Sequence, residues 1–121
     1  MVNAHLAETK QQITILDKVF ASINQKAEGQ KCDAIEGLIK ETDGLIKEAS
    51  GVALEACLIA AAQAVEHYEI ARYGTLREWA KDLGHTKAHE LLTDILDMEK
   101  AANSKLTSLA VGSVNKAKMA A

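Results

Sequence analysis

The longest uninterrupted pattern in the chain is residues 52–83, which read VALEACLIAAAQAVEHYEIARYGTLREWAKDL. Six residues follow one another here at alternating intervals of four and three positions: Ala62, Glu66, Glu69, Tyr73, Leu76 and Ala80. Such spacing is typical of one face of an α-helix. The stretch therefore predicts a long helix whose buried face carries two glutamates in line with apolar residues.

The composition points to the same class of fold. The 121 residues are 48% hydrophobic, contain 21 alanines and contain no proline. Because proline breaks helix interiors and alanine favours them, this composition favours helices throughout. It excludes a β-sandwich, a β-barrel and a proline-rich disordered chain. We expect an all-α protein.

Helical periodicity extends the pattern to the rest of the chain. We expect further helices at about residues 4–24, 33–49 and 86–111. The first should carry an apolar stripe formed by Leu6, Ile13, Leu16 and Phe20 and widened by Ile15 and Val19. Asp33 and Glu36 fit a capping box, and Gly37 and Gly44 suggest close packing against a neighbouring helix. Residues 1–111 are expected to form one domain, and residues 112–121 a flexible tail.

Charge and hydropathy narrow the range of partners. The net charge of −3 gives no basic field for a nucleic acid. The longest nearly uncharged apolar run, residues 56–65, is too short to span a membrane. We therefore expect neither a nucleic-acid nor a membrane partner. Cys32 and Cys57 lack the spacing of a metal site or a disulfide scaffold, so we expect a reducing, cytoplasmic location.

Acidic residues on helix faces that should be apolar are the main sign of chemistry. Glu66 and Glu69 are adjacent in space on a helix, and two bare buried carboxylates would repel and lose hydration. Glu99 follows Leu96 by three residues and precedes Leu106 by seven, so it also points inward. A divalent metal would relieve the cost of all three. The alternative is that each glutamate lies on a solvated helix face.

Two histidines extend the candidate ligand set. His5 and Glu8 form His-x-x-Glu at the edge of the first apolar stripe, and His67 lies about 100° around the helix from Glu66. Carboxylates and imidazoles that converge from several helices are the ligands of di-iron and di-manganese bundles. Each histidine also has an interpretation without metal binding: His5 is then a surface residue and His67 a packing residue.

Four segments resemble the YciE/YciF-type bacterial ferritin-like family. They are VEHYEIARYGTL at 65–76, KCDAIEGLI at 31–39, HLAET at 5–9 and LDMEKAA at 96–102. The resemblance covers about residues 5–110. It implies a ferritin-like helical bundle of up-down helices with a crossover helix, a role in the stress response and a di-iron or di-manganese centre. The implied metal ligands are His5, Glu8, Glu66, Glu69 and Glu99, with His67 as a further candidate.

The chain also departs from the family pattern. It begins near the family's second helix, so we expect an N-terminally short bundle, and Met98 and Asn103 stand where the pattern has acidic residues. A missing helix would expose an apolar groove, which predicts a homodimer or higher homo-oligomer. Two alternatives follow for the metal centre. In the first it is retained, and in the second it is incomplete or empty. In the second case the chain is a non-catalytic structural or assembly protein.

Overall fold

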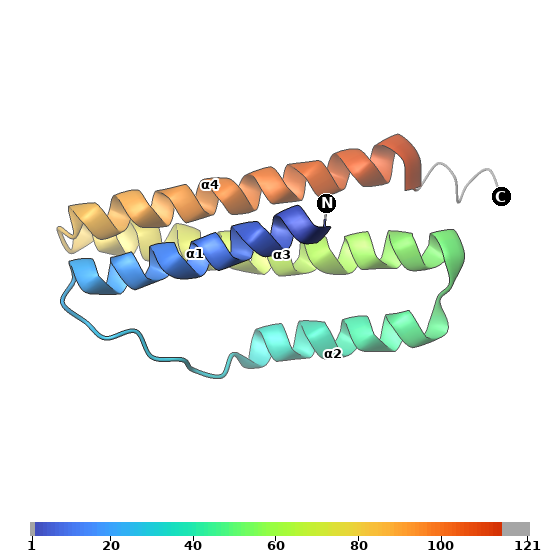
Figure 1. Cartoon of the computed structure of the whole chain (residues 1–121), viewed down its shortest axis with the longest axis horizontal. Helices are drawn as coiled ribbons and strands as arrows, with labels where there is room; N and C mark the ends of the chain where they lie inside the picture. Colours follow the sequence, from blue (N-terminus) through green and yellow to red (C-terminus); the bar gives the residue numbers. More distant parts are fainter. Residues whose placement is uncertain (1, 115–121) are drawn as a thin grey trace. The chain divides into compact units, whose positions relative to one another are not determined.

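Helices make up nearly all of the structure, a computed structural model that describes residues 2–114 (Figure 1). They are α1 (Val2–Ser22), α2 (Asp33–Glu48), α3 (Gly51–Asp82) and α4 (Thr86–Leu109), followed by a π-helix at Ala110–Val114. No strand occurs between residues 2 and 114. The predicted all-α class is confirmed, and every helix end lies within about two residues of its expected position.

The last ten residues were expected to form a flexible tail. The π-helix includes residues 112–114, the first part of that segment. Residues 115–121 lie outside the described residues, so the tail stays a prediction.

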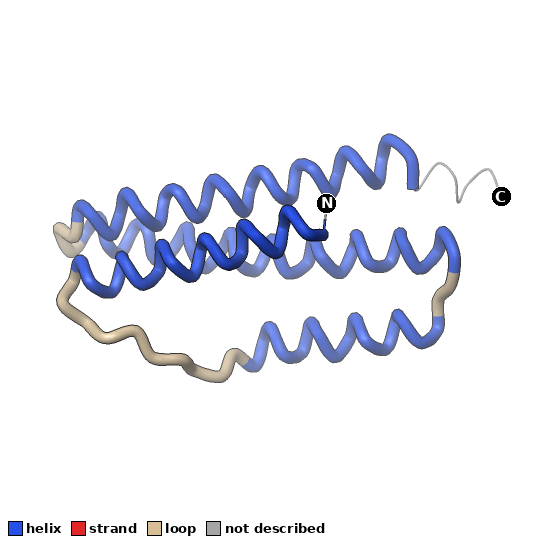
Figure 2. Tube along the Cα trace, in the orientation of Figure 1, coloured by secondary structure: helices blue, strands red, loops and turns tan. Residues whose placement is uncertain are grey.

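Two helices end in the same hydrogen-bonded motif. After α3, Gly84 has a φ of 77°, its N–H donates to Lys81 O at 3.0 Å, and His85 N–H donates to Ala80 O at 2.8 Å. After α1, Asn24 has a φ of 57° and takes the equivalent place. This is the Schellman motif, which needs a left-handed residue that glycine and asparagine tolerate best. The tan segment between α1 and α2 in Figure 2 is the long polar loop that follows.

The chain divides into two compact units, and α3 and α4 each contribute a part to both. The first unit consists of Met1–Gly29 and Glu69–Ala102, and the second of Gln30–Tyr68 and Asn103–Ala121. The first unit therefore combines α1 with the end of α3 and the beginning of α4. The second combines α2 with the remaining parts of α3 and α4.

The core of the first unit lies where α1, α3 and α4 meet. Its buried members are Val19, Ala80, Ala88, Leu91 and Leu92, and the half-buried residues packed against them are Ile15, Leu16, Ile23 and Tyr73. Ile95 of α4 is also fully buried. Small residues of α3 pack here beside leucines of α4, which keeps the helices close.

The buried face of α1 was predicted correctly at Ile15, Leu16 and Val19 and wrongly at Leu6 and Ile13. Leu6 and Ile13 are exposed, Ile13 by 57%, whereas Gln12 and Val19 of the same helix are buried. Leu76 of α3, predicted to be buried, is also exposed. Apolar side chains recur around α1 in two overlapping rows, and only packing against α3 and α4 selects the row that contains Val19.

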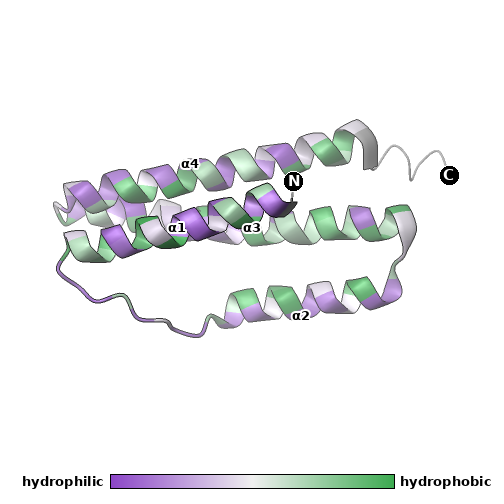
Figure 3. Ribbon diagram, in the orientation of Figure 1, coloured by the Kyte–Doolittle hydropathy of each residue, from purple (hydrophilic) through white to green (hydrophobic). Residues whose placement is uncertain are grey.

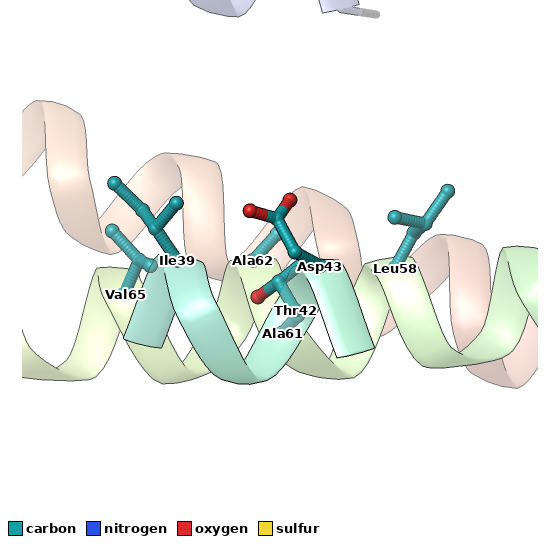
Figure 4. A pocket seen from close by; sticks show the side chains of 7 residues that line it. All are labelled: Ile39, Thr42, Asp43, Leu58, Ala61, Ala62 and Val65. Carbon is teal, nitrogen blue, oxygen red and sulfur yellow. The ribbon is translucent and has the colours of Figure 1, made fainter. Parts of the chain in front are cut away.

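In the second unit, Ile59 of α3 packs with Leu106 and Ala110. The helix α2 contributes no buried residue, although it carries hydrophobic and hydrophilic residues in alternation (Figure 3). Its N-terminal end is held to α3 by a contact of 3.3 Å between Cys32 Sγ and Tyr68 Oη. A shallow apolar groove between the two helices is lined by Ile39, Thr42, Asp43, Leu58, Ala61, Ala62 and Val65 (Figure 4).

Two local predictions about α2 are wrong. The N-cap is Cys32, with no side-chain capping bond, so Asp33 and Glu36 lie inside the first turn and do not form a capping box. Both pair instead with Lys31, at 3.6 and 3.4 Å. Gly37 and Gly44 do not pack closely against a neighbouring helix, because an added Cβ at either position would meet no atom within 4 Å.

The open space around these glycines leads to a stability prediction. We expect Gly37→Ala and Gly44→Ala each to raise the free energy of unfolding by about 0.5–1 kcal/mol, because alanine loses less backbone entropy in a helix. Gly84→Ala is the control and should destabilise, because its φ of 77° disfavours a side chain. Urea denaturation followed by circular dichroism measures all three. A loss of stability in both α2 variants would contradict the open environment.

Candidate metal centre

Two acidic side chains from different helices meet inside the first unit. Carboxylate oxygens of Glu69 on α3 and Glu99 on α4 lie within 4.8 Å of each other. Glu99 is only 1% exposed. Burial, a side-chain hydrogen bond to Glu99 and the charge of Glu99 together raise the pKa of Glu69 from 4.5 to about 8. Because two ionised carboxylates cannot hydrogen-bond to each other, Glu69 holds the proton at neutral pH when no cation is bound.

A glutamine from α1 completes this contact. Gln12 is 7% exposed, and its side-chain Nε2 donates a hydrogen bond to Glu99 Oε1. Sequence reasoning missed this residue because the predicted stripe of α1 was traced through apolar residues alone. The available signal was its position, four residues before Leu16 and seven before Val19, on the row that the structure buries. A polar residue on such a row marks a site or a buried network.

Tyr73 lies one turn after Glu69 on α3. Burial and the charges of Glu69 and Glu99 raise its pKa to about 12. The side chain therefore stays a neutral phenol at any physiological pH. It also packs against the apolar core that contains Val19 and Leu92. The carboxylates consequently have an uncharged, largely dry boundary on this side, and that boundary strengthens every charge interaction within the site.

Glu66 lies one turn before Glu69 on the same face of α3, as predicted. Its side chain is 2% exposed, and one of its carboxylate oxygens lies within 4.8 Å of a carboxylate oxygen of Glu69. Because α3 is one continuous helix, this neighbour relation follows from the helical repeat alone. Glu66, Glu69 and Glu99 are therefore the predicted site residues that the structure brings together.

The other predicted ligands do not join this acidic group in the described part of the chain. His5 is exposed, and Glu8 is half-buried one turn before Gln12. His67 is exposed, and its Nδ1 lies 2.7 Å from the carbonyl oxygen of Gln63. A carbonyl only accepts, so Nδ1 carries the proton and Nε2 keeps its lone pair. That these three residues bind metal remains a prediction.

The donor set fits a hard or borderline divalent cation. Carboxylate and amide oxygens are ligands suited to manganese, magnesium and ferrous iron. A cation would displace the proton that Glu69 holds, which is the usual coupling between metal binding and protonation. The set is smaller than in dinuclear bundle sites, which use four glutamates and two histidines.

Comparison with known proteins identifies the family. Residues 1–119 match the family described as "Domain of unknown function (DUF892)". The chain belongs to this family. It is 50% identical over 116 residues to protein YciF of Escherichia coli strain K12, covering 94% of this chain and 70% of that protein. The predicted resemblance to YciE/YciF-type proteins is confirmed.

Solved structures of DUF892-like chains support the fold. The crystal structure of the E. coli stress protein YciF aligns with a TM-score of 0.88 and 50% identity, over 94% of this chain and 73% of that one. YcfI of Rhodopseudomonas palustris, described as a candidate structural protein, aligns with a TM-score of 0.85 and 52% identity, over 88% of this chain and 68% of that one. The DUF892 chain therefore has the helical-bundle fold of these proteins. None of the helices in the described residues combines the length and hydropathy that a membrane span requires.

The raised pKa of Glu69 predicts how stability depends on pH in the DUF892 chain. Between pH 4.5 and about 8 the folded state binds a proton that the unfolded state has released. The free energy of unfolding of chelator-treated protein should therefore be largest below this range and fall as the pH rises through it. Denaturant titrations at several pH values measure the slope.

Two matched variants test whether the pH dependence of stability comes from Glu69 and not from another acidic residue. Glu69→Gln cannot ionise, so we expect the slope to flatten. Glu55→Gln changes an exposed residue of the same helix and should leave it intact. An unchanged slope in Glu69→Gln would show that the proton resides elsewhere.

Proposed function

We propose that this chain is a metal-binding protein of the bacterial stress response, in which Glu66, Glu69 and Glu99 hold iron or manganese. The proposal is carried by the buried contact between Glu69 and Glu99, which needs a positive counterpart between its oxygens. A proton supplies this counterpart in part, and a divalent cation would supply it more fully. The link to stress rests on the 50% identity with YciF, which is named a stress protein.

A di-iron or di-manganese centre, which the family resemblance implies, is the larger form of this proposal. It would need His5 and Glu8 of α1, with His67 as a further nitrogen ligand, because dinuclear bundle sites use about six protein ligands. A bound iron or manganese ion would supply redox and Lewis-acid chemistry. The protein contributes oxygen ligands and a dry wall formed by Tyr73 and its apolar neighbours. The proposal includes no assigned reaction or substrate.

A structural or assembly role is the second candidate function. The observation in its favour is that Gln12, Glu69 and Glu99 already hydrogen-bond to one another without a metal. Glu69 hydrogen-bonds to Glu99, and Gln12 donates to Glu99 from the other side. Hydrogen bonds of this kind between α1, α3 and α4 stabilise the packing of the three helices. The description of YcfI as a candidate structural protein agrees with this role.

Location and assembly complete the proposal. We place the protein in the cytoplasm, consistent with Cys32 and Cys57 forming no disulfide. We also propose a homodimer or higher homo-oligomer. The first unit exposes five large apolar residues on α1 and around the end of α3: Leu6, Ile13, Leu76, Trp79 and Leu83. Large apolar side chains exposed to water are typical of a protein interface.

Metal titration distinguishes the two candidate functions. We expect purified, chelator-treated protein to bind Fe²⁺ under anaerobic conditions, or Mn²⁺, at one or more ions per chain in calorimetry and elemental analysis. Glu69→Gln removes a ligand charge and should weaken binding about tenfold or more. Glu55→Gln on the exposed face of α3 is the control. Binding well below one ion per chain, equal in wild type and Glu69→Gln, would leave the structural role.

The single tryptophan reports on self-association. Trp79 is 59% exposed, so its fluorescence in a monomer should resemble that of indole in water. If the apolar residues of the first unit form the interface, the emission should shift to shorter wavelength as protein concentration rises, because the ring loses water. Sedimentation velocity over the same range gives the mass. A monomer at all concentrations would refute the oligomer.

A further inference from the structure

Gln12 is a buried amide that α1 directs at the Glu99 carboxylate. Gln12 is 7% exposed, and Glu99 is 1% exposed. A buried amide loses hydration and normally remains only where it finds a partner. The side-chain nitrogen of Gln12 donates a hydrogen bond to Glu99 Oε1. The neighbouring Gln11 is exposed, so the contact depends on the face of α1 and not on the residue type alone.

The core of the first unit fixes the position from which this amide reaches Glu99. Leu16 and Val19 follow Gln12 by four and seven residues, on the same row of α1. Val19 belongs to the buried core, and Leu16 packs against it. Packing of these apolar side chains sets the rotation of α1, and the rotation sets the direction of the Gln12 side chain. A carboxylate that is bonded to so fixed a donor has fewer accessible rotamers.

The amide is suited to this position because it is a neutral donor. An ionised carboxylate only accepts hydrogen bonds, so Gln12 has to present its –NH₂ group to Glu99. A lysine or arginine would also donate, but its charge would cancel the negative charge that attracts a cation. The amide orients Glu99 and leaves its charge and its remaining lone pairs available. Hydrogen bonds of this kind to a ligating carboxylate typically change metal affinity about 10- to 100-fold.

Resting on the proposed metal-binding function, we propose that Gln12 is a positioning residue of the metal centre, whose amide orients the Glu99 carboxylate toward a divalent cation without neutralising it. Gln12 acts through Glu99 and does not itself contact the ion. The role does not depend on how many ions bind, and it leaves room for the further ligands that His5 and Glu8 would supply.

Substitutions at position 12 test this role, with Mn²⁺ alone as the probe and calorimetry on chelator-treated protein as the measurement. Gln12→Met keeps the length of the side chain and removes the donor, so Mn²⁺ binding should weaken about tenfold. Gln12→Lys keeps a donor but adds a positive charge. It should lose most Mn²⁺ binding, yet unfold in chelator at no lower temperature than the wild type. Gln11→Met is the control and should match the wild type.

A double-mutant cycle shows whether Gln12 acts through Glu99. In the Glu99→Gln background, adding Gln12→Met should cause no further loss of Mn²⁺ affinity, because the carboxylate that the amide positions is gone. A further loss of about tenfold, the size expected for a ligand that contacts the ion itself, would overturn the positioning role.

The remaining outcomes separate this inference from the proposed function. Equal Mn²⁺ affinity in the wild type and Gln12→Met, or full binding by Gln12→Lys, would overturn the inference and leave metal binding intact. If the wild type binds neither Mn²⁺ nor Fe²⁺, the proposed function fails and the inference fails with it. Thermal unfolding in chelator verifies that each variant is folded.

Discussion

The contact between Glu69 and Glu99 constrains the first unit more than any other interaction. Two carboxyl groups from different helices are held together away from water, where an ionised pair would be strongly unfavourable. The pair is tolerable only with a proton or a cation between its oxygens. The raised pKa of Glu69 reflects the first solution. A site that accepts either form is suited to binding a metal in exchange for a proton.

The surroundings of this pair are neutral. Gln12 contributes an amide, Tyr73 stays a phenol, and the adjacent core consists of aliphatic side chains from three helices. None of these groups offers a permanent positive charge to the carboxylates. Among these groups, the proton that Glu69 holds is the positive counterpart of the pair.

The second unit has a different character. α2 buries no side chain, and its main described link to α3 is the contact between Cys32 and Tyr68. Its glycines leave open space, and the groove beside it is shallow and apolar. The unit with the larger buried core is thus the one that holds the carboxylate pair. The Glu69–Glu99 pair thus lies in the first unit, within a fold shared with YciF.

The sequence by itself determined the all-α class, the helix ends at Asn24 and Gly84, and the pairing of Glu66 with Glu69, because helical repeat, left-handed caps and proline content act over a few residues. It also placed Glu99 inward, since leucines flank it on one face of α4. Only the tertiary structure decided which row of α1 is buried. Two rows of similar hydropathy compete there, and contact with α3 and α4 selects the one that contains Gln12. That choice, made by packing between segments distant in the chain, brings an amide to the carboxylates and leaves Leu6 and Ile13 exposed.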